Sequence, residues 1–333
     1  MPALTMIQAL NLALKQEMAK DDSIIVLGED VGIDGGVFRV TEGLLNAFGE
    51  ERVLDTPLAE SGIVGCAIGM ALYGLKPVCE IQFSGFSYLA MHQFESHAAR
   101  LRWRSRGRYT VPLVARMPYG GGVRALEHHS ESREVYYAHT PGLKIVLPSG
   151  PRTARALLVS AVRDPDPVIF FEPKLIYRAF REDVPEEEET LPIGKSRIVR
   201  EGRDLTMITY GAMLRRTLEA AEQLAREDGR QAEVIDLLTL SPLDDEQFTA
   251  SAHKTGHVVI VHEACRSFGP GAEIVARLVE KAFFYLEAPI QRVTGFDVIF
   301  PYFAREQAYL PDVARILHGA RGALRAASMV SQV

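Results

Sequence analysis

A carboxylate at the start of a glycine-rich apolar stretch, Glu60, is the first candidate for proton chemistry. Gly62, Gly65 and Gly69 follow it at three- and four-residue spacing, which costs helix stability but lets another backbone approach closely. Burial at the start of such a helix should favour the protonated carboxyl, so Glu60 could exchange a proton with a ring nitrogen. A plainer interpretation is that Glu60 complements the helix dipole from the first turn.

The second candidate is a polar loop, Gly120-Gly-Gly-Val-Arg-Ala-Leu-Glu-His-His-Ser-Glu-Ser132. Its three glycines permit unusual backbone conformations, and the adjacent His128 and His129, followed by Ser130, suit proton transfer near neutral pH. Loops beyond strand ends are where α/β sheets bind ligands. The alternative is a surface loop with solvated histidines.

Other kinds of site find little support in the sequence. His92 and His97 are five residues apart, and the histidines between 253 and 262 are spread over different predicted elements, so no zinc pattern results. Neither a dinucleotide fingerprint nor a phosphate-binding P-loop occurs. A serine hydrolase would need a nucleophile elbow, G-x-S-x-G, which is absent.

Composition limits the partners and the compartment. The 333 residues include 37 Lys plus Arg against 43 Asp plus Glu, a net charge of -6, so no global basic field would hold nucleic acid or an anionic membrane. Three widely spaced cysteines predict a reducing compartment, the cytoplasm. The N-terminal residues 1–22 have no signal or transit pattern, and no apolar run reaches membrane-spanning length.

Hydrophobic periodicity predicts two doubly wound α/β domains. A helix over 4–19 precedes a buried strand at 23–28, and further apolar β-rich segments recur at 78–83, 111–117, 144–148 and 168–171. This rhythm favours a parallel sheet covered on both faces. Residues 86–103 follow a helical period that would place Leu89 and Phe94 on one apolar face.

An acidic, proline-flanked run separates the two predicted domains. After it, strands are predicted at 205–210, 232–238, 258–261 and 290–293, with an amphipathic helix over 213–227 that stops at Gly229. We therefore expect domains at 1–181 and 196–323, an acidic linker at 182–195 and a flexible tail at 324–333.

Seven segments along the chain carry a resemblance to a known family. They are Val26-Leu-Gly-Glu-Asp-Val, Gly35-Gly-Val-Phe-Arg-Val-Thr-Glu-Gly-Leu, Asp55-Thr-Pro-Leu-Ala-Glu, Glu80-Ile-Gln-Phe, His129-Ser-Glu-Ser, Phe171-Glu-Pro-Lys and Arg292-Val-Thr-Gly-Phe-Asp. Because they occur in the family's order and cover most of the chain, they are more specific than any single motif. In these segments the chain resembles the beta-subunit family of pyruvate and branched-chain 2-oxo acid dehydrogenases, the thiamine-diphosphate-dependent decarboxylating component of those complexes.

The resemblance implies a transketolase-like pyrimidine-binding domain followed by a transketolase C-terminal domain. It further implies that Glu60 hydrogen-bonds the aminopyrimidine N1' of thiamine diphosphate and promotes the imino tautomer. Phe86 would stack on the pyrimidine, and Leu58 would line the same pocket. His129 would assist decarboxylation and transfer of the acyl group to a lipoyl group, although the division of roles among His128, His129 and Ser130 stays open.

The resemblance also implies partners, because the chain lacks the G-D-G motif that presents a divalent ion to the diphosphate. An alpha subunit would hold the diphosphate and Mg²⁺ in an alpha2beta2 heterotetramer, which would work with the dihydrolipoyl acyltransferase core and its lipoyl domain. Some family members hold a monovalent cation, possible K⁺ here, near the equivalents of Leu113, Ala161, Asp164 and Asp166.

The main functional prediction is oxidative decarboxylation of a branched-chain 2-oxo acid such as 2-oxoisovalerate, with acyl transfer to the lipoyl-bearing acyltransferase. The alternative is a pyruvate dehydrogenase beta subunit that makes acetyl-dihydrolipoyl. The resemblance implies that the alpha subunit builds most of the acyl pocket, so one methylene of specificity, worth only ~1–3 kcal/mol, cannot be read from this chain. Remoter alternatives are a non-catalytic docking scaffold and a homodimeric transketolase-like enzyme.

Overall fold

The histidine-bearing segment 120–135 does not fold with the residues that flank it in the sequence. In the computed structural model, which describes residues 2–330, the chain forms two compact units. The first contains residues 2–119 and 136–193, and the second contains 120–135 together with 194–330. The first unit therefore lacks a segment that sequence order alone had assigned to the domain at 1–181.

Unit 1 is built on parallel strands in the order β6-β7-β5-β4-β2-β3. These strands are β2 (Ile24–Gly28), β3 (Val53–Asp55), β4 (Lys76–Glu80), β5 (Val114–Tyr119), β6 (Lys144–Val146) and β7 (Val168–Pro173). Most of their residues are buried, as expected for a parallel sheet covered on both faces, which confirms the predicted fold class. Gly28 pairs with Asp55 on one side and with Glu80 on the other, so three strand ends meet at one edge.

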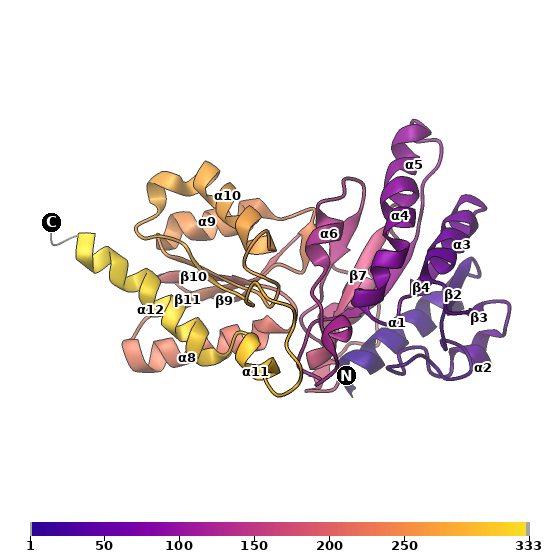
Figure 1. Ribbon diagram of the computed structural model, residues 1–333, viewed down its shortest axis with the longest axis horizontal. Coiled ribbons are helices and arrows are strands. Elements are labelled where there is room, and N and C mark those ends of the chain that lie inside the picture. The colour runs from indigo at the N-terminus through magenta and orange to yellow at the C-terminus, as the bar shows by residue number, and fades with distance from the viewer. Residues whose placement is uncertain (1, 331–333) are drawn as a thin grey trace. The chain divides into compact units, whose positions relative to one another are not determined.

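The helices of unit 1 begin where local chemistry favours them. Thr5 and Gln8 form a capping box for α1 (Met6–Lys20), and a proline at the first position opens α7 (Pro151–Val162). α1 packs against α7, and α3 (Glu60–Leu72) packs against β4 and the 3-10 segment η1 (Ser84–Ala90). Figure 1 shows α3 next to β4. The remaining elements are α2 (Leu44–Phe48), α4 (Met91–Gln93), the π-helical η2 (Phe94–Ala98), α5 (Ala99–Arg104) and η4 (Lys174–Ile176).

The acidic run after unit 1's last helical turn lies along α1 and α7. The short strand β8 (Glu182–Asp183) pairs antiparallel with β1 (Ala3–Leu4). Glu188 then forms ion pairs with Lys20 and Arg163, and Glu189 with Arg152. The division between the two units follows at residue 193.

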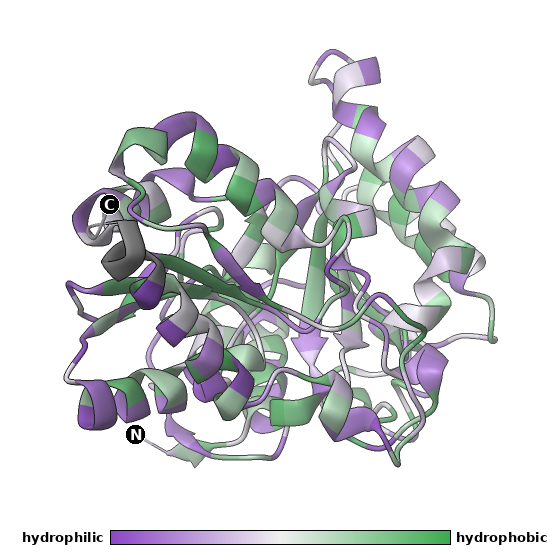
Figure 2. Ribbon diagram, turned by 60° about the vertical axis from the view of Figure 1, so that its left-hand side comes forward, coloured by the Kyte–Doolittle hydropathy of each residue, from purple (hydrophilic) through white to green (hydrophobic). Residues whose placement is uncertain are grey.

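Unit 2 has its own sheet, in the order β14-β13-β10-β11-β9. β10 (Leu205–Thr209) runs parallel to β11 (Ala232–Asp236) and β13 (Val258–Val261), β14 (Gln291–Val293) runs parallel to β13, and β9 (Arg197–Arg200) is an antiparallel edge. Figure 1 shows α9 (Asp245–Thr255) and α10 (Pro270–Ala282) on one side of this sheet and α8 (Met213–Asp228) and α12 (Val313–Val330) on the other. In Figure 2 the strands are coloured mainly as hydrophobic, and the helices on either side alternate between hydrophilic and hydrophobic residues along their length.

Of two helices in unit 2, one ends at the predicted residue and the other continues into the segment that was predicted to be a flexible tail. Gly229 adopts the left-handed conformation and ends α8, as predicted. α12 carries its helical backbone to residue 330, and the rest of the predicted tail, 331–333, lies outside the described residues. Smaller elements of unit 2 are β12 (Thr239–Ser241), η3 (Glu127–His129), η5 (Phe283–Tyr285) and α11 (Glu306–Tyr309), while α6 (Glu134–Ala138) begins in unit 2 and ends in unit 1. Among the described helices, none is long and apolar enough to cross a lipid bilayer.

Candidate functional site

Glu60 is the first residue of α3, and its residue surface is only 4% exposed. The preceding residue, Ala59, offers no side chain to cap the helix. The carboxylate of Glu60 is therefore an acidic group in the first turn, near backbone N–H groups that no cap satisfies. Its burial agrees with the expectation from the apolar, glycine-rich helix that it opens.

A second buried carboxyl, that of Glu29, is close enough to Glu60 for the charge of Glu60 to affect its pKa. Glu29 directly follows β2 and is 8% exposed, and its Oε1 has no hydrogen-bond partner among the described residues. Burial, together with the charges of Glu60 and Asp30, raises the pKa of Glu29 above its ordinary value. Sequence reasoning missed this residue, although its place at the carboxyl end of a buried parallel strand was an available signal.

The loop that carries Glu29 is fixed to the neighbouring strands. Asp55, the last residue of β3, accepts hydrogen bonds from the backbone N–H groups of Gly32 (2.6 Å) and Ile33 (3.0 Å). The amide of Gln82 donates to Asp30 at 2.9 Å. These hydrogen bonds fix the loop after β2 to the carboxyl ends of β3 and β4, and together they form one acidic edge of the sheet.

Phe86 and Leu58 differ in their surroundings. Phe86 lies half-buried in η1, the segment that packs against α3, and its ring contacts Phe83 edge-on with centroids 5.8 Å apart. Leu58 is 77% exposed. The structure thus brings the element carrying Phe86 to the helix that begins with Glu60, and it leaves Leu58 on the surface of this chain.

A buried ion network crosses the same edge of the sheet. Arg116 on β5 donates to Glu80 on β4 (2.6 Å) and to both carboxylate oxygens of Glu172 on β7 (2.7 and 3.0 Å). The Tyr177 hydroxyl donates to Glu172 at 2.5 Å. Burial raises the pKa of Glu80 against the opposing effect of Arg116, and burial also raises the pKa of Tyr177. The guanidinium of Arg116 therefore stabilises the sheet by binding these two carboxylates.

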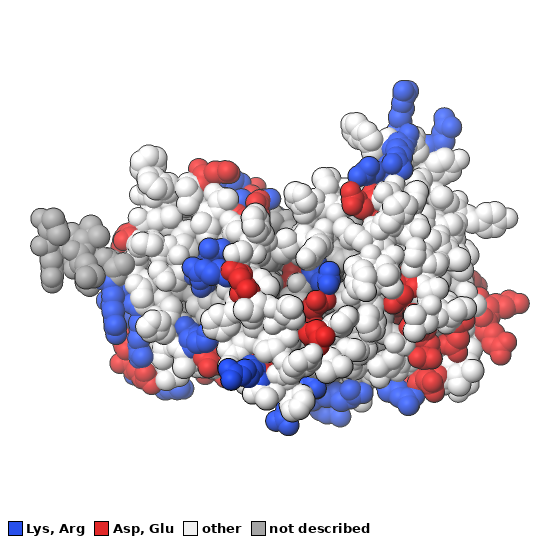
Figure 3. Space-filling model, viewed as in Figure 1, with Lys and Arg blue, Asp and Glu red and all other residues white. Residues whose placement is uncertain are grey.

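Exposed positive charge gathers elsewhere on unit 1. The end of α5 and the following turn carry a series of exposed arginines, which Figure 3 shows as the blue group at the upper right. Two of them are paired, Arg100 with Glu95 and Arg102 with Asp166.

The acidic edge at Glu29, Asp30 and Asp55 has the opposite charge. It is suited to a cationic or proton-donating heterocycle and repels a free phosphate group.

The histidine loop belongs to unit 2. His128 and His129 lie in η3, where the side chain of His128 is 54% exposed, with Nδ1 3.4 Å from a carboxylate oxygen of Glu127. His129 is half-buried, and Ser130 is only 1% exposed. Glu60 and the two histidines thus belong to different units, and their predicted roles stay predictions.

The residues suggested for a monovalent cation are already engaged. Lys144 donates to both carboxylate oxygens of Asp164 at 2.7 Å, and Arg102 donates to Asp166. The backbone oxygen of Leu113 accepts from the N–H of residue 168, and that of Ala161 accepts from Asp164. Lys144 and Arg102 therefore already supply positive charge at these two carboxylates. Within residues 2–330, moreover, no group of three or more His, Cys, Asp or Glu could hold a metal ion.

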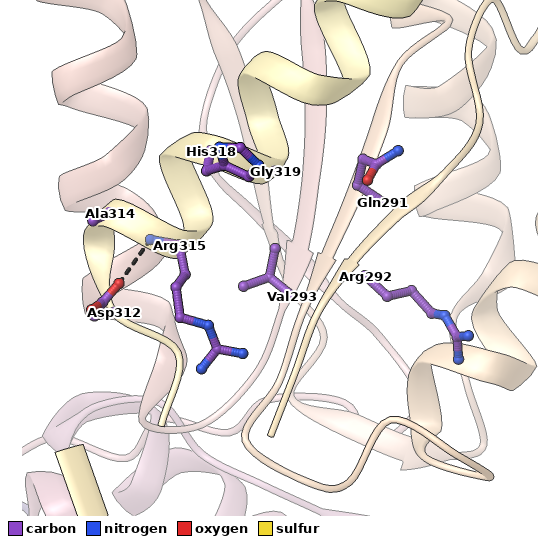
Figure 4. A pocket seen from close by; sticks show the side chains of 8 residues that line it. All are labelled: Gln291, Arg292, Val293, Asp312, Ala314, Arg315, His318 and Gly319. Atoms are coloured by element: carbon purple, nitrogen blue, oxygen red, sulfur yellow. Dashed lines mark hydrogen bonds between the residues drawn. The ribbon is translucent and has the colours of Figure 1, made fainter. Parts of the chain in front are cut away.

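An open pocket of about 420 Å³ lies in unit 2, between β14 and α12 (Figure 4). Its most prominent charge, Arg315, donates to the backbone oxygens of Tyr309 and Thr294, and its guanidinium lies over the ring of Phe296. The N–H of Arg315 also donates to Asp312 at 2.7 Å. Arg315 and Asp312 therefore stabilise the local structure through these bonds, and none of the predicted site residues lines the pocket.

Comparison with known proteins gives consistent matches along the chain. Residues 2–179 match the family model described as transketolase, pyrimidine binding domain, and residues 194–316 match transketolase, C-terminal domain. The chain is 51% identical over 316 residues to the pyruvate dehydrogenase E1 component subunit beta of Acholeplasma laidlawii, covering 95% of this chain and 96% of that protein. It is 50% identical over 324 residues to the protein of the same name from Bacillus subtilis, covering 97% and 99%.

A solved structure shares the fold. It is described as a split gene transketolase, inactive beta4 tetramer, and it superposes with a TM-score of 0.78 over 98% of this chain and 99% of its own. The sequence identity is 22%, so this likeness concerns the fold alone.

Proposed function

Because the chain belongs to the family of pyruvate dehydrogenase E1 component beta subunits, with the pyrimidine-binding and C-terminal domains of transketolase, we propose that it supplies half of a thiamine-diphosphate site in a pyruvate-decarboxylating enzyme. The observation that carries the proposal is the buried Glu60 at the start of α3, beside the buried carboxyl of Glu29. An acidic side chain shielded from water is what a ring nitrogen needs if it is to share a proton.

The residues present fit the heterocyclic part of the cofactor. Glu60 would bind the pyrimidine nitrogen, and the half-buried ring of Phe86 offers a flat apolar contact. The diphosphate fits poorly, because the described edge presents Glu29, Asp30 and Asp55. We therefore assign the diphosphate and Mg²⁺ to an alpha subunit, within an alpha2beta2 assembly that passes its product to a lipoyl-bearing acyltransferase.

Bound thiamine diphosphate supplies an electron sink for the loss of carbon dioxide. The side chains of this chain would accept and donate the protons that the reaction requires. The buried carboxyl of Glu60 is kept away from bulk water, where it could share a proton with a ring nitrogen. His129, with His128 beside it, would hold or deliver a proton at its imidazole.

Pyruvate is the better-supported substrate. The relatives that match over nearly the whole length are named for pyruvate, which supports the alternative more than the branched-chain main prediction. The proposal includes no potassium ion, because the carboxylates of Asp164 and Asp166 are engaged by Lys144 and Arg102. It keeps the cytoplasm as the compartment, since the three cysteines are free.

The test is Glu60→Gln in the complex reconstituted with its alpha partner, thiamine diphosphate and Mg²⁺. We expect turnover of pyruvate to fall by about 10²–10⁴-fold, the usual contribution of a positioned proton-transfer group, while assembly is unchanged. Glu50→Gln, on an exposed residue of unit 1, is the matched control and should keep full activity. Unchanged turnover in Glu60→Gln would overturn the proposal.

The same preparation separates the alternatives. Parallel assays on pyruvate and 2-oxoisovalerate decide between the two acid classes by their ratio of kcat/KM. Activity of this chain without an alpha partner would favour the homodimeric transketolase-like enzyme. Assembly without any dependence of turnover on Glu60 or His129 would favour the docking scaffold.

A further inference from the structure

The segment that carries the two histidines closes on itself. We call residues 120–131 the histidine loop; the N–H of Gly120 donates to the backbone oxygen of Glu131 at 3.1 Å and joins its ends. Inside the loop, the N–H of His129 donates to the oxygen of Leu126 at 3.0 Å. These bonds give the loop a local shape, but they do not attach it to the rest of unit 2.

The first attachment is Glu263, which follows β13 by two residues and is 3% exposed. Its carboxylate accepts a hydrogen bond from the N–H of Gly121 at 2.9 Å. A Cβ atom at Gly120 would come within 2.6 Å of the same carboxylate, and the φ of +78° there is itself one that favours glycine. The glycines at the start of the loop therefore permit a close approach to this acid.

The second attachment is Glu306, the first residue of α11, which is fully buried. Its Oε2 accepts from the N–H of Arg124 at 3.0 Å. Arg124 has a φ of +58°, a conformation that non-glycine residues adopt only when their surroundings impose it. Nearby, the ring of Phe300 packs so tightly on Gly121 that a Cβ there would lie 2.3 Å from it.

The third attachment is Glu134, just beyond the loop, which is also fully buried. The Tyr210 hydroxyl donates to its Oε1 at 2.6 Å, while its Oε2 has no hydrogen-bond partner among the described residues. Tyr210 follows β10 directly. Burial raises the pKa of Glu134 to about 7, and the charge of Glu263 adds to the effect.

We propose that Glu134, Glu263 and Glu306 are positioning residues through which the C-terminal unit sets the conformation of the histidine loop. The catalytic meaning of this inference rests on the proposed function, since only that function gives the histidines a role. The carboxyl ends of the parallel strands β10 and β13, where α/β sheets usually receive a ligand, here receive a loop of the same chain. Two attachments hold backbone N–H groups, so they fix main-chain geometry whatever side chains the loop carries.

The hold on the loop depends on pH through Glu134. Its carboxyl faces Tyr210 from β10, Glu263 from the end of β13 and Tyr309 from α11, with no cation among these groups. The folded-state pKa lies above the ordinary value, so the protonated carboxyl is compatible with burial below that value. The stabilisation is lost as the pH rises through about 7, when Glu134 ionises beside Glu263.

The attachment is tested by amide hydrogen exchange in the complex assembled with its alpha partner. Glu306→Ala should speed exchange at residues 122–130 by about tenfold or more, as expected when an N–H loses a charged acceptor. Glu306→Gln retains an accepting oxygen and should restore most of the protection. Glu280→Gln, exposed on α10, is the control and should change nothing. Unchanged loop exchange in Glu306→Ala would overturn the inference.

The pH dependence is tested by Glu134→Gln and by the milder Tyr210→Phe. Between pH 6 and 8, loop exchange corrected for the intrinsic rate should rise in the unmodified chain and stay flat in Glu134→Gln. Tyr210→Phe removes one hydroxyl and should move the transition to higher pH. Identical profiles in all three proteins would overturn this part.

Activity measurements connect the loop to the chemistry. If the proposed function holds, Glu306→Ala lowers kcat for acyl transfer to the lipoyl group and leaves the KM for the 2-oxo acid unchanged. A failure of the proposed function shows first as full turnover in Glu60→Gln, and it leaves the exchange results valid. A failure of the inference leaves Glu60→Gln inactive while loop exchange does not respond to Glu306.

Discussion

Replacing Arg116 with methionine removes the cation that pairs with Glu80 and Glu172 in their buried network. The three side chains are between 0% and 3% exposed, and Arg116 makes bonds of 2.6, 2.7 and 3.0 Å to the two carboxylates. Methionine preserves most of the apolar volume of the arginine stem, so the loss is chiefly electrostatic. The two carboxylates would remain in a low-dielectric interior without their cation, and only the Tyr177 hydroxyl bond to Glu172 would be kept.

The expected cost follows from that geometry. Breaking a buried ion pair by removing one partner costs about 3–5 kcal/mol, because the remaining charge is uncompensated. For a unit of this size, such a loss corresponds to a melting temperature about 6–20 °C lower. Arg102→Met is the matched control, because its bond to Asp166 is at the surface, with Arg102 46% exposed, and should be worth only about 0–1 kcal/mol.

The assay is thermal unfolding of both variants at pH 5 and pH 8. Burial already raises the pKa of Glu80, and losing Arg116 removes the main opposing effect. The carboxyl of the variant is therefore protonated at low pH at little cost, and the destabilisation grows as the pH rises. Equal destabilisation at both pH values, or a loss no larger than that of Arg102→Met, would refute the reasoning.

Two further predictions concern the backbone of unit 1. Gly142→Ala should lower the melting temperature by several degrees more than Gly74→Ala: both positions have positive φ, but only the first places a Cβ 2.2 Å from a carbonyl oxygen, that of Ala99. Equal shifts in the two variants would show that conformational strain, rather than the clash, sets the cost. Asp55→Ala should speed amide exchange at residues 32 and 33 and cost about 1–3 kcal/mol, because the bond to the N–H of Gly32 is lost; unchanged exchange there would contradict the assigned anchoring.

The sheets were predictable from the sequence because their signal is local. Runs such as Ile24–Gly28 and Val258–Val261 are apolar and β-branched, and that composition suffices for a buried parallel strand. Glu60 could be placed at the start of a buried helix for the same reason. The period over 86–103 was misleading: the structure replaces one helix with 3-10, α and π turns, which change the phase and leave Leu89 50% exposed while Phe94 is buried.

The site could be predicted only where its residues carry their own signal. His128 and His129 were selected as candidates from their type and their glycine-rich context, and their roles stay predictions. Their attachment to unit 2 could not be found, because the acceptors lie up to 182 residues further along the chain and no local pattern reports such a distance. Glu29 was missed because a single glutamate after a strand becomes distinctive only when Glu60 is seen to lie near it.

The distance between the histidine loop and its anchors has a consequence for biosynthesis. A ribosome that has delivered residue 193 has delivered all of unit 1, including β8, which pairs with β1. At synthesis rates of about 5–20 residues per second, Glu306 follows about 6–23 seconds later. During that interval the nascent chain can pair the strands from β2 to β7, while the histidine loop still lacks its acceptor Glu306. A product truncated before Glu306 would therefore contain the strands of unit 1 but not the attachment of the loop at residue 124.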